Sequence, residues 1–389
     1  MKLLIVTRER KGERCYGLGR AMNRFASELR QRAHEVFYLS ASDWVHTDHL
    51  LFQEIQTKFL LKARGSGLSE ILAPALAERF VQGMLAAKIA HDMKVTHIWF
   101  QDPWIALGYL RKRKTYFKNS QAPLWGVTEH GLGSSIRAAA YDGLTVNART
   151  LAWTHRLEYH ILKKADWVFT PSKVALEQLC RDLGADPCPE NWQILGYGTP
   201  DPISISRENA REMLGWSDNI DYILTIGRLS PVKRMHDLVA ACARIQERRT
   251  RPLQLFILGQ GDTSLVETTA ERYGFHPHIL FAEDVQPYLA AADVYLSAST
   301  AESFGLANQE AIAAGLPSIL ACGGASCEVA KTGAWIINGS IDSFSEALLA
   351  LLRDRTLLRF WAERATQQHW PKWRDIIDEC ERKLLSRTT

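Results

Sequence analysis

The chain has 389 residues, of which 46% are hydrophobic and 23% are charged. These ordinary globular proportions exclude a mainly disordered, collagen-like or coiled-coil chain, and the length predicts two or three domains. The formal net charge is +4, from 47 basic and 43 acidic side chains, which is too small to indicate a dedicated nucleic-acid binder.

Short apolar runs alternate with helical patterns through the first half of the chain. Lys2–Thr7 is expected to be a buried parallel strand, followed by a glycine-bearing turn, a helix over Ala21–Gln31 and a strand over His34–Leu39. Further short strands are expected at His97–Phe100, Leu124–Val127 and Trp167–Thr170. This succession predicts a doubly wound β/α domain.

A second alternation begins after Asn191–Pro202, a stretch rich in Gly and Pro that predicts a linker. Strands are expected at Tyr222–Ile226, Leu253–Leu258, Ile279–Phe281, Val294–Ser297 and Pro317–Leu320, with helices beginning at Met235 and Asn308. Two β/α blocks of similar size predict two facing doubly wound domains with a cleft between them. We expect the first domain at 1–195, the second at 196–360, and a C-terminal helical segment, 361–389, that packs back toward the first.

The two halves of the chain differ in charge. Residues 1–195 contain 27 basic and 19 acidic side chains, a net charge of +8. Residues 196–389 contain 20 basic and 24 acidic side chains, a net charge of −4. The two halves are therefore expected to meet different partners.

The cysteines and the apolar segments indicate the cellular compartment in which the protein is expected to lie. An odd number of cysteines without a Cys-x-x-Cys pair predicts buried free thiols in a reducing environment. They stand at positions 15, 180, 188, 242, 322, 327 and 380. The apolar run at the N-terminus is too short for a signal peptide, and the longest apolar stretch, Ile71–Ala90, contains charged residues. We expect a cytoplasmic protein.

The segment Ala301–Pro317 has the strongest chemical pattern. Its two carboxylates, Glu302 and Glu310, stand eight positions apart where an expected strand leads into an expected helix. Gly305 permits close approach of the backbone to a ligand, and free N–H groups at a helix start can bind an anion. The alternative is that Glu302 caps the helix and Glu310 is a solvated helix residue.

A second pattern, Gly227–Lys233, follows another expected strand of the same domain. Arg228 and Lys233 stand five positions apart, and a guanidinium with an ammonium suits the two phosphates of a nucleoside diphosphate. Either cation alone would be interpreted as a surface residue. Because both patterns occupy equivalent ends of one predicted sheet, a shared ligand site is favoured.

Three weaker signals lie in the first half of the chain. Gly17 and Gly19 follow the first expected strand and are typical of either a tight turn or a ligand-facing loop. His130 follows the strand Leu124–Val127 and is either a polar loop residue or a neutral imidazole that orients a hydroxyl group. A basic run with aromatic residues is either a solvated helix or loop, or a contact with an anionic membrane surface or an acidic acceptor. Its basic residues are Arg111, Lys112, Arg113, Lys114 and Lys118.

Taken in order, these elements resemble a known enzyme family. The matching segments extend over about 130 residues and are Gly227–Lys233, Gly259–Gly261, Glu302–Glu310 with Gly315 and Pro317, and Gly323-Gly324 with Glu328. The chain resembles a retaining glycosyltransferase of the GT-B fold, of the glycosyltransferase family 4 (group 1) type. The resemblance implies two facing Rossmann-like domains, the first binding an acceptor and the second a nucleotide-sugar donor.

The resemblance also implies a role for each candidate residue. Arg228 and Lys233 would hold the donor diphosphate and stabilise the leaving group, so that no metal or other cofactor is required. Glu310 would accept hydrogen bonds from the ribose hydroxyls, whereas Glu302 and His130 would contact the donor sugar. The remaining donor-binding positions would be Gly17, Gly19, Ser303, Phe304, Gly305 and Leu306.

Two positions depart from the family pattern. Many members have Pro and Leu where this chain has Ala307 and Gln309, and we expect altered packing there with activity kept. The expected reaction moves a sugar from a nucleoside diphosphate, most commonly UDP, to a glycan, lipopolysaccharide or lipid-linked acceptor in the cytoplasm or at the inner face of the membrane. The alternatives are a nucleotide-sugar epimerase of the same fold and a non-catalytic nucleotide-sugar-binding subunit. The sequence does not identify the sugar, the base, the acceptor or the oligomeric state.

Overall fold

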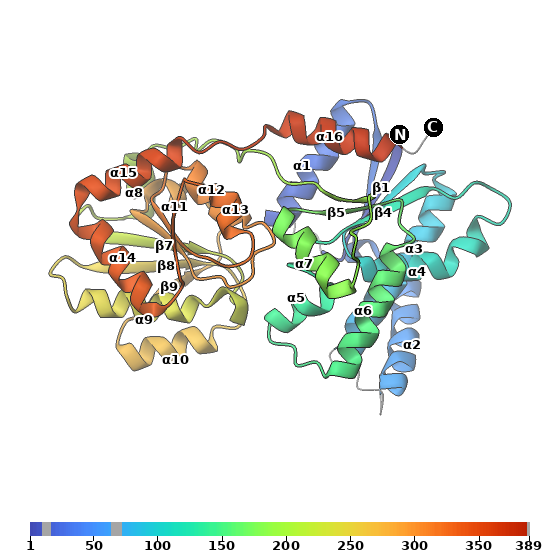
Figure 1. Cartoon of the computed structure of the whole chain (residues 1–389), viewed down its shortest axis with the longest axis horizontal. Coiled ribbons are helices and arrows are strands. Elements are labelled where there is room, and N and C mark those ends of the chain that lie inside the picture. Colours follow the sequence, from blue (N-terminus) through green and yellow to red (C-terminus); the bar gives the residue numbers. More distant parts are fainter. Residues whose placement is uncertain (10–16, 64–71, 387–389) are drawn as a thin grey trace. The chain divides into compact units, whose positions relative to one another are not determined.

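A computed structural model of the chain describes residues 1–9, 17–63 and 72–386 (Figure 1). Cys15 and Ile71, which belong to the expected glycine turn and the longest apolar stretch, lie outside the described residues. The chain forms two units, and it passes from the first to the second between Tyr197 and Gly198. Unit 1 also contains the described residues from Trp373 onward, and unit 2 includes the short segment Tyr141–Gly143.

Unit 1 is built on a parallel sheet with the strand order β2-β1-β3-β4-β5-β6. Its strands are β1 (Lys2–Val6), β2 (Glu35–Leu39), β3 (His97–Phe100), β4 (Leu124–Thr128), β5 (Trp167–Thr170) and β6 (Trp192–Ile194). The strands β3, β4 and β5 are buried along their whole or nearly whole length because helices cover both faces of the sheet. The chain reverses its direction of winding between β1 and β3, which creates a topological switch point there.

The helices of unit 1 connect these strands. They are α1 (Gly17–Gln31), the 3-10 turn η2 (Ala41–Asp43), α2 (His46–Ala63), α3 (Leu72–Asp92), α4 (Pro103–Tyr116), α5 (Ser135–Tyr141), α6 (Ala148–Leu162), α7 (Lys173–Leu183) and α16 (Trp373–Leu385). The expectation of a turn over Gly17 and Gly19 before a helix at Ala21 is wrong, because α1 already begins at Gly17. Glycine lowers helix stability by about 1 kcal/mol, but burial of Gly19, Met22 and Phe25 on one side of α1 compensates.

Unit 2 contains a second parallel sheet, with the order β12-β11-β10-β7-β8-β9. Its strands are β7 (Asp221–Ile226), β8 (Leu253–Leu258), β9 (His278–Leu280), β10 (Val294–Ser297), β11 (Ser318–Ala321) and β12 (Trp335–Ile337). Apolar clusters cover both faces of this sheet, with Ile223 and Leu255 on one side and Leu224 and Phe256 on the other. The doubly wound α/β architecture expected from the sequence is therefore confirmed for both halves of the chain.

The helices of unit 2 are α8 (Arg207–Leu214), the 3-10 turn η3 (Pro231–Lys233), α9 (Met235–Gln246), α10 (Ser264–Tyr273), α11 (Gln286–Ala291), α12 (Leu306–Ala313), α13 (Ser326–Ala330), α14 (Ile341–Arg353) and α15 (Arg355–Thr366). The expected single segment at 361–389 is divided between the units. Trp361 lies within α15 of unit 2, whereas α16 packs in unit 1, where the Trp373 and Phe25 rings meet edge to face with centroids 5.3 Å apart. Pro371 interrupts the helical pattern between them.

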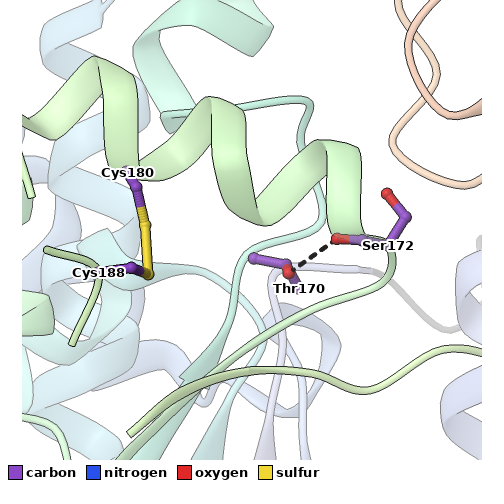
Figure 2. The surroundings of a disulfide bond; sticks show 4 residues. All are labelled: Thr170, Ser172, Cys180 and Cys188. Atoms are coloured by element: carbon purple, nitrogen blue, oxygen red, sulfur yellow. Dashed lines mark hydrogen bonds between the residues drawn. A yellow bond between two sulfur atoms is a disulfide. The ribbon is translucent and has the colours of Figure 1, made fainter. Parts of the chain in front are cut away.

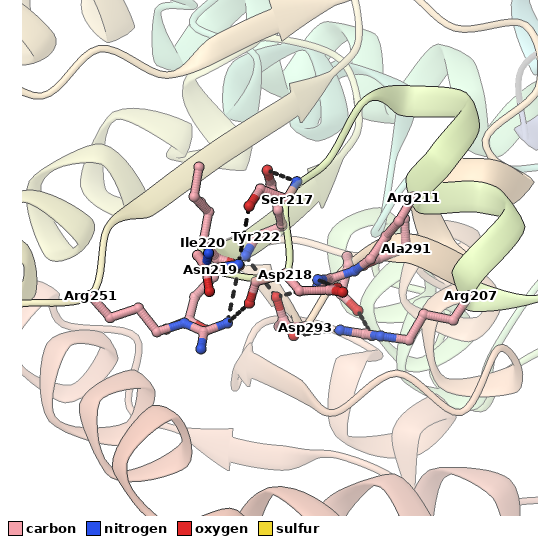
Figure 3. A network of polar contacts seen from close by, with 12 residues as sticks. Arg207, Arg211, Ser217, Asp218, Asn219, Ile220, Tyr222, Arg251, Ala291 and Asp293 are labelled. Atoms are coloured by element: carbon pink, nitrogen blue, oxygen red, sulfur yellow. Dashed lines mark hydrogen bonds and ion pairs between the residues drawn. The ribbon is translucent and has the colours of Figure 1, made fainter.

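A polar network holds the end of the second sheet that lies opposite the carboxyl ends of its strands (Figure 3). Arg211 is buried and pairs with Asp293 at 2.9 Å and with Asp218 at 2.8 Å. Asp293 also accepts the backbone N–H of Tyr222 at 2.8 Å. Because Asp293 precedes β10 and Tyr222 belongs to β7, the network fixes α8 against the two central strands. Its buried charges are each compensated by a partner, as burial requires.

The cysteines differ from the expectation of buried free thiols. Cys180 and Cys188 form a disulfide, because Gly184 ends α7 in a left-handed conformation and turns the chain back toward the helix (Figure 2). Cys242 and Cys380 are buried free thiols, whereas Cys322 is exposed. In the described part of the chain, no helix combines the length and the apolar character that crossing a membrane requires.

Candidate functional site

The candidate site in unit 2 lies at the topological switch point of the second sheet. On one side of the sheet the strands follow the order β7-β8-β9, and on the other side they follow the order β10-β11-β12. The chain therefore winds in opposite directions from the neighbouring strands β7 and β10. Open α/β sheets bind ligands beyond the carboxyl ends of such strands. Lys233 follows β7 and Glu302 follows β10, so the sheet delivers both predicted residues to this edge.

Lys233 and Glu302 form an ion pair, with 2.5 Å between Nζ and Oε1. Their side chains are 24% and 11% exposed, so solvent reaches the ammonium group while the carboxylate is largely covered. The backbone N–H of Thr300 donates to the carbonyl of Val232 at 3.0 Å, which fixes the two segments side by side. The structure thus brings together two residues that are 69 positions apart.

Glycines let the loops at this edge pack without side chains between them. A Cβ atom on Gly259 would lie 1.8 Å from the carbonyl oxygen of Gly227, and one on Gly261 would lie 2.1 Å from that of Leu229. Both distances are far below any van der Waals contact, so only glycine fits. The predicted Gly259–Gly261 motif therefore has a packing reason, which is to hold the loop after β8 against the loop after β7.

A second glycine pair seats the loop after β11. A Cβ atom on Gly323 would lie 2.2 Å from the carbonyl oxygen of Ser299, and one on Gly324 would lie 2.2 Å from that of Glu302. The backbone N–H of Ala325 donates to the Glu302 carbonyl at 2.7 Å. The main chain of Glu302 is therefore fixed by the loop that follows the neighbouring strand.

The segment from Ser303 to Glu310 begins α12. Gly305 has a φ of +89°, which an L side chain rarely adopts, and the helix starts at the next residue, Leu306. Phe304 is buried, while Ser303, Leu306 and Glu310 are half-buried. This geometry explains why Gly305 stands between the two carboxylates.

Both carboxylates act on one buried residue that the sequence analysis missed. Burial raises the pKa of Tyr295, and the charges of Glu302 and Glu310 raise it further. Its hydroxyl donates to Asn308 Oδ1 at 3.1 Å. Tyr295 lies within the apolar strand β10. The only sign in the sequence that it could have a polar role was its hydroxyl group in this otherwise apolar run.

The departures from the family pattern also have a structural consequence. Gln309 is buried, and its amide nitrogen donates to the carbonyl of Gly198 at 3.2 Å. A leucine at this position could not make that bond. The amide thus ties α12 to the start of the segment that leads into unit 2.

Arg228 has a different environment from Lys233. Its side chain is 63% exposed and pairs with Asp142, which belongs to the same unit. Lys233 pairs with Glu302 instead, so the two predicted phosphate-binding cations have separate partners in this structure. In the described part of the chain, no cluster of three His, Cys, Asp or Glu side chains is arranged to hold a metal ion.

In unit 1, His130 follows β4 and its ring is held on both sides. Nε2 lies 2.8 Å from Gln101 Oε1, and Nδ1 lies 3.2 Å from the hydroxyl of Tyr197. The Gln101 amide N–H donates to the carbonyl of Trp99, so its oxygen accepts from Nε2–H and Nδ1 accepts from Tyr197. Burial lowers the pKa of His130 to about 3, which keeps the imidazole neutral.

Buried carboxyl groups surround this histidine, and the sequence analysis did not assign them a role. Burial and the charge of Asp102 raise the pKa of Glu129 to about 8, and Ser135 donates its hydroxyl to this carboxyl at 3.0 Å. Burial opposes ionisation of Asp102 too, but Arg79 lies 2.7 Å away and holds the pKa of Asp102 below its usual value. Unit 1 therefore has an ionised carboxyl, that of Asp102, and a protonated carboxyl, that of Glu129, close to His130.

The remaining candidates lie on helices of unit 1. Gly17 and Gly19 occupy the first turn of α1, where Gly19 is buried. The basic run covers the end of α4, which terminates at Tyr116. Arg111, Lys114 and Lys118 are exposed, whereas Lys112 and Arg113 are half-buried. The basic charges are thus displayed at the surface of unit 1.

Comparisons with known proteins show which families and proteins this chain is similar to. Residues 206–368, almost the whole of unit 2, match the family described as glycosyl transferases group 1. A D-inositol 3-phosphate glycosyltransferase of Gordonia bronchialis is 28% identical over 316 residues, which are 72% of this chain and 64% of that protein. The lipopolysaccharide glucosyltransferase WaaG of Escherichia coli is 31% identical over 207 residues, 50% of this chain and 55% of that protein. The matched parts thus span less than two thirds of either relative.

The fold has solved counterparts. Anabaena HepE in complex with UDP-glucose superposes with a TM-score of 0.71 at 18% identity, covering 99% of this chain and 100% of that one. Sucrose-phosphate synthase from Thermosynechococcus elongatus superposes with a TM-score of 0.70 at 17% identity, covering 100% and 98%. Assignment to the numbered family 4 stays a prediction. Residues 206–368 thus match the group 1 glycosyl transferase family, and the whole chain has the GT-B fold.

Proposed function

We propose that this protein is a retaining glycosyltransferase that moves a sugar from a nucleoside diphosphate, UDP in the first instance, to a glycan, lipopolysaccharide or lipid-linked acceptor. The observation that carries the proposal is the Lys233–Glu302 pair at the switch point of the second sheet. Support for UDP comes from HepE, whose structures contain UDP or UDP-glucose.

The donor diphosphate takes the place of Glu302 as the partner of Lys233. A phosphate oxygen competes well for an ammonium group that is 24% exposed, and the same charge then stabilises the leaving diphosphate. Arg228, with its side chain 63% exposed, exchanges Asp142 for the phosphates in the same way. Glu302, once released, is free to accept hydrogen bonds from sugar hydroxyls.

The ribose and the sugar are bound by the segment that begins α12. Glu310 is half-buried and accepts the two ribose hydroxyls, for which a carboxylate has two suitable oxygens. The backbone from Ser303 to Leu306 faces the phosphates and the sugar, since Gly305 has no side chain to obstruct them. Because cationic side chains neutralise the diphosphate, transfer is expected to persist in EDTA.

Unit 1 supplies the acceptor side. Its basic surface on α4 favours an acidic or membrane-associated acceptor. His130 is neutral, so it orients a hydroxyl group without adding charge. WaaG, which is 31% identical over 207 residues, is named as a lipopolysaccharide glucosyltransferase, and this supports an acceptor of that kind.

The proposal is tested by a thermal-shift screen of nucleoside diphosphates, followed by transfer assays with the nucleotide sugars that bind. A ligand at 100 times its Kd stabilises the protein by about 2.7 kcal/mol, which raises the melting temperature measurably. The anomeric configuration of the product, read by NMR, separates retention from inversion. Failure of every nucleoside diphosphate to bind would overturn the proposed donor, and an inverted product would overturn the retaining mechanism.

A further inference from the structure

Two thiols of unit 2 lie against each other at the edge of the candidate site. Cys322 directly follows β11 and Cys327 belongs to α13, and their Sγ atoms are 2.6 Å apart. This separation is roughly half an ångström longer than the ~2.05 Å bond of a disulfide. Cys322 is exposed and Cys327 is half-buried, so an oxidant in solution can reach the pair.

The loop between these thiols is the one that seats Glu302. Gly323 and Gly324 pack on the carbonyl oxygens of Ser299 and Glu302, and Ala325 N–H donates to the Glu302 carbonyl at 2.7 Å. Two glycines give this loop more conformational freedom than other residues would. A bond between its ends would therefore restrain the main chain beside the Lys233–Glu302 pair.

We propose that Cys322 and Cys327 are an oxidisable thiol pair that controls the mobility of the loop beside Glu302, with a peroxide as the oxidant. The peroxide transfers one oxygen to the Cys322 sulfur, giving a sulfenic acid and releasing water or an alcohol. The Cys327 sulfur then attacks the sulfenic sulfur, the S–O bond breaks, and the departing hydroxide takes the Cys327 thiol proton and leaves as water while the disulfide forms. A dithiol reductant reverses the change.

The environments of the two sulfurs set the order of these steps. Burial and the neighbouring Cys322 raise the pKa of Cys327 to about 11, so this thiol stays protonated at neutral pH. The thiolate is the reactive form, and exposure favours oxidation, so Cys322 reacts first and Cys327 resolves the product. Cys242 and Cys380 are fully buried and are expected to remain reduced.

The effect on the donor site rests on the proposed function. The disulfide fixes the loop in the arrangement described, in which Glu302 holds Lys233. A donor diphosphate must displace that carboxylate, so the oxidised protein is expected to bind UDP about threefold or more weakly than the reduced protein. The restraint itself does not depend on the ligand, and it should slow hydrogen exchange at Ala325 about fivefold or more.

The experiment treats the whole chain with hydrogen peroxide and maps it with trypsin. Cys322 and Cys327 lie in one tryptic peptide, Tyr273–Lys331, which contains no other cysteine. An internal disulfide lowers the mass of this peptide by two hydrogen atoms, and a reductant restores it. In Cys327→Ser the resolving thiol is absent, so Cys322 is expected to gain oxygen or to link two chains instead. Cys242→Ala serves as the matched control and should behave like the wild type.

Each result decides a separate part of the proposal. An unchanged peptide mass after peroxide would overturn the thiol pair, and a disulfide that leaves exchange at Ala325 unchanged would overturn the restraint. A disulfide with slow exchange but unaltered UDP affinity would overturn the coupling to the donor site. If the reduced protein fails to bind UDP at all, the proposed donor is wrong, while the mass and exchange measurements still test the thiol pair.

Discussion

The two sheets place opposite kinds of electrostatics at equivalent edges. In unit 2 the ammonium of Lys233 and the carboxylate of Glu302 are both charged partners in a pair that solvent reaches. In unit 1, by contrast, two of the groups beside the sheet, Glu129 and His130, have lost their charge. The pKa of Glu129 is raised to about 8, and that of His130 is lowered to about 3, each chiefly by burial.

Because of this difference, substitutions in the two regions should be detected by different measurements. A charge that is paired but accessible can change its partner for a ligand, so its removal should alter binding and turnover more than folding. A group that burial keeps neutral cannot change partners without cost, so it should appear in the pH dependence of stability.

The largest expected effect is that of Lys233→Ala on turnover. Loss of the ammonium removes charge stabilisation from the leaving diphosphate, which for preorganised donors costs a factor of about 10² to 10³. The variant also leaves the Glu302 carboxylate, whose side chain is 11% exposed, without its cation. Turnover of the nucleotide sugar identified by the screen gives the measurement.

The control for this variant is Arg272→Ala, which removes one positive charge from the exposed face of α10. It should keep wild-type turnover. Circular dichroism and the melting temperature show whether Lys233→Ala remains folded. Wild-type turnover in a folded Lys233→Ala protein would contradict the role given to the ion pair.

The second prediction concerns Glu129→Gln and the stability of unit 1. Burial raises the folded pKa of Glu129 to about 8 from its ordinary value of 4.5, so its stabilising contribution is complete below pH 4.5 and is lost as the pH rises to 8. The unfolding free energy should therefore fall with pH by at most about 1.4 kcal/mol per pH unit in this window. Glutamine does not titrate, so the variant should lack the part of this slope that Glu129 contributes.

The titration of His130 determines in which part of the range from pH 4.5 to 8 the effect of Glu129 on stability can be measured. Burial lowers its folded pKa to about 3 from 6.5, so its contribution is present above pH 6.5 and lost as the pH falls toward 3. The two slopes oppose each other between pH 4.5 and 6.5, whereas from 6.5 to 8 His130 no longer opposes Glu129. The buried Glu158, whose pKa is also raised by burial and by Glu129, adds a slope of the same sign in the wild type and in the variant. Native-state hydrogen exchange of β3 and β4 in that upper range, with exposed Glu190→Gln as control, measures the Glu129 slope. Equal slopes in the wild type and Glu129→Gln would refute the buried proton.

The sequence predicted the accessible site better than the buried one. The motifs around Lys233 and Glu302 consist of charged residues and glycines at strand ends, and a parallel sheet necessarily brings such ends to one edge. Glu129 and Asp102 each have an ordinary local sequence. Their properties arise from burial and from Arg79 on α3, which only the tertiary packing supplies.

The errors at helix boundaries have the same origin. Gly17 and Gly19 predicted a turn because glycine weakens helices, yet packing of α1 on the sheet outweighs that preference. The pairing of Cys180 with Cys188 depends on the left-handed Gly184 that reverses the chain after α7. Residue spacing alone predicts neither the start of α1 nor this disulfide, because both depend on the tertiary path of the chain.

A third prediction sharpens the assignment of the two carboxylates in unit 2. Glu310→Ala should weaken binding of a nucleoside diphosphate about tenfold, or about 1.4 kcal/mol, because the ribose hydroxyls lose a charged acceptor. Calorimetry with UDP measures the change, and exposed Glu267→Ala on α10 is the matched control. Comparison with UMP and with uracil locates the loss. Unchanged affinity in a folded Glu310→Ala protein would remove the ribose contact from the proposal.

The smallest expected effect belongs to the basic surface of unit 1. Lys114 is exposed near the end of α4, and replacement by Gln should weaken adsorption to anionic vesicles by about 1 kcal/mol, roughly a factor of five at low salt. Lys173→Gln on α7 removes the same charge from a side chain that is 72% exposed. It is the control because it lies outside the basic run. If both variants lose adsorption equally, only the net charge of the basic half matters. A loss confined to Lys114→Gln, abolished by salt, would mark the end of α4 as the part of the acceptor domain that meets an anionic surface.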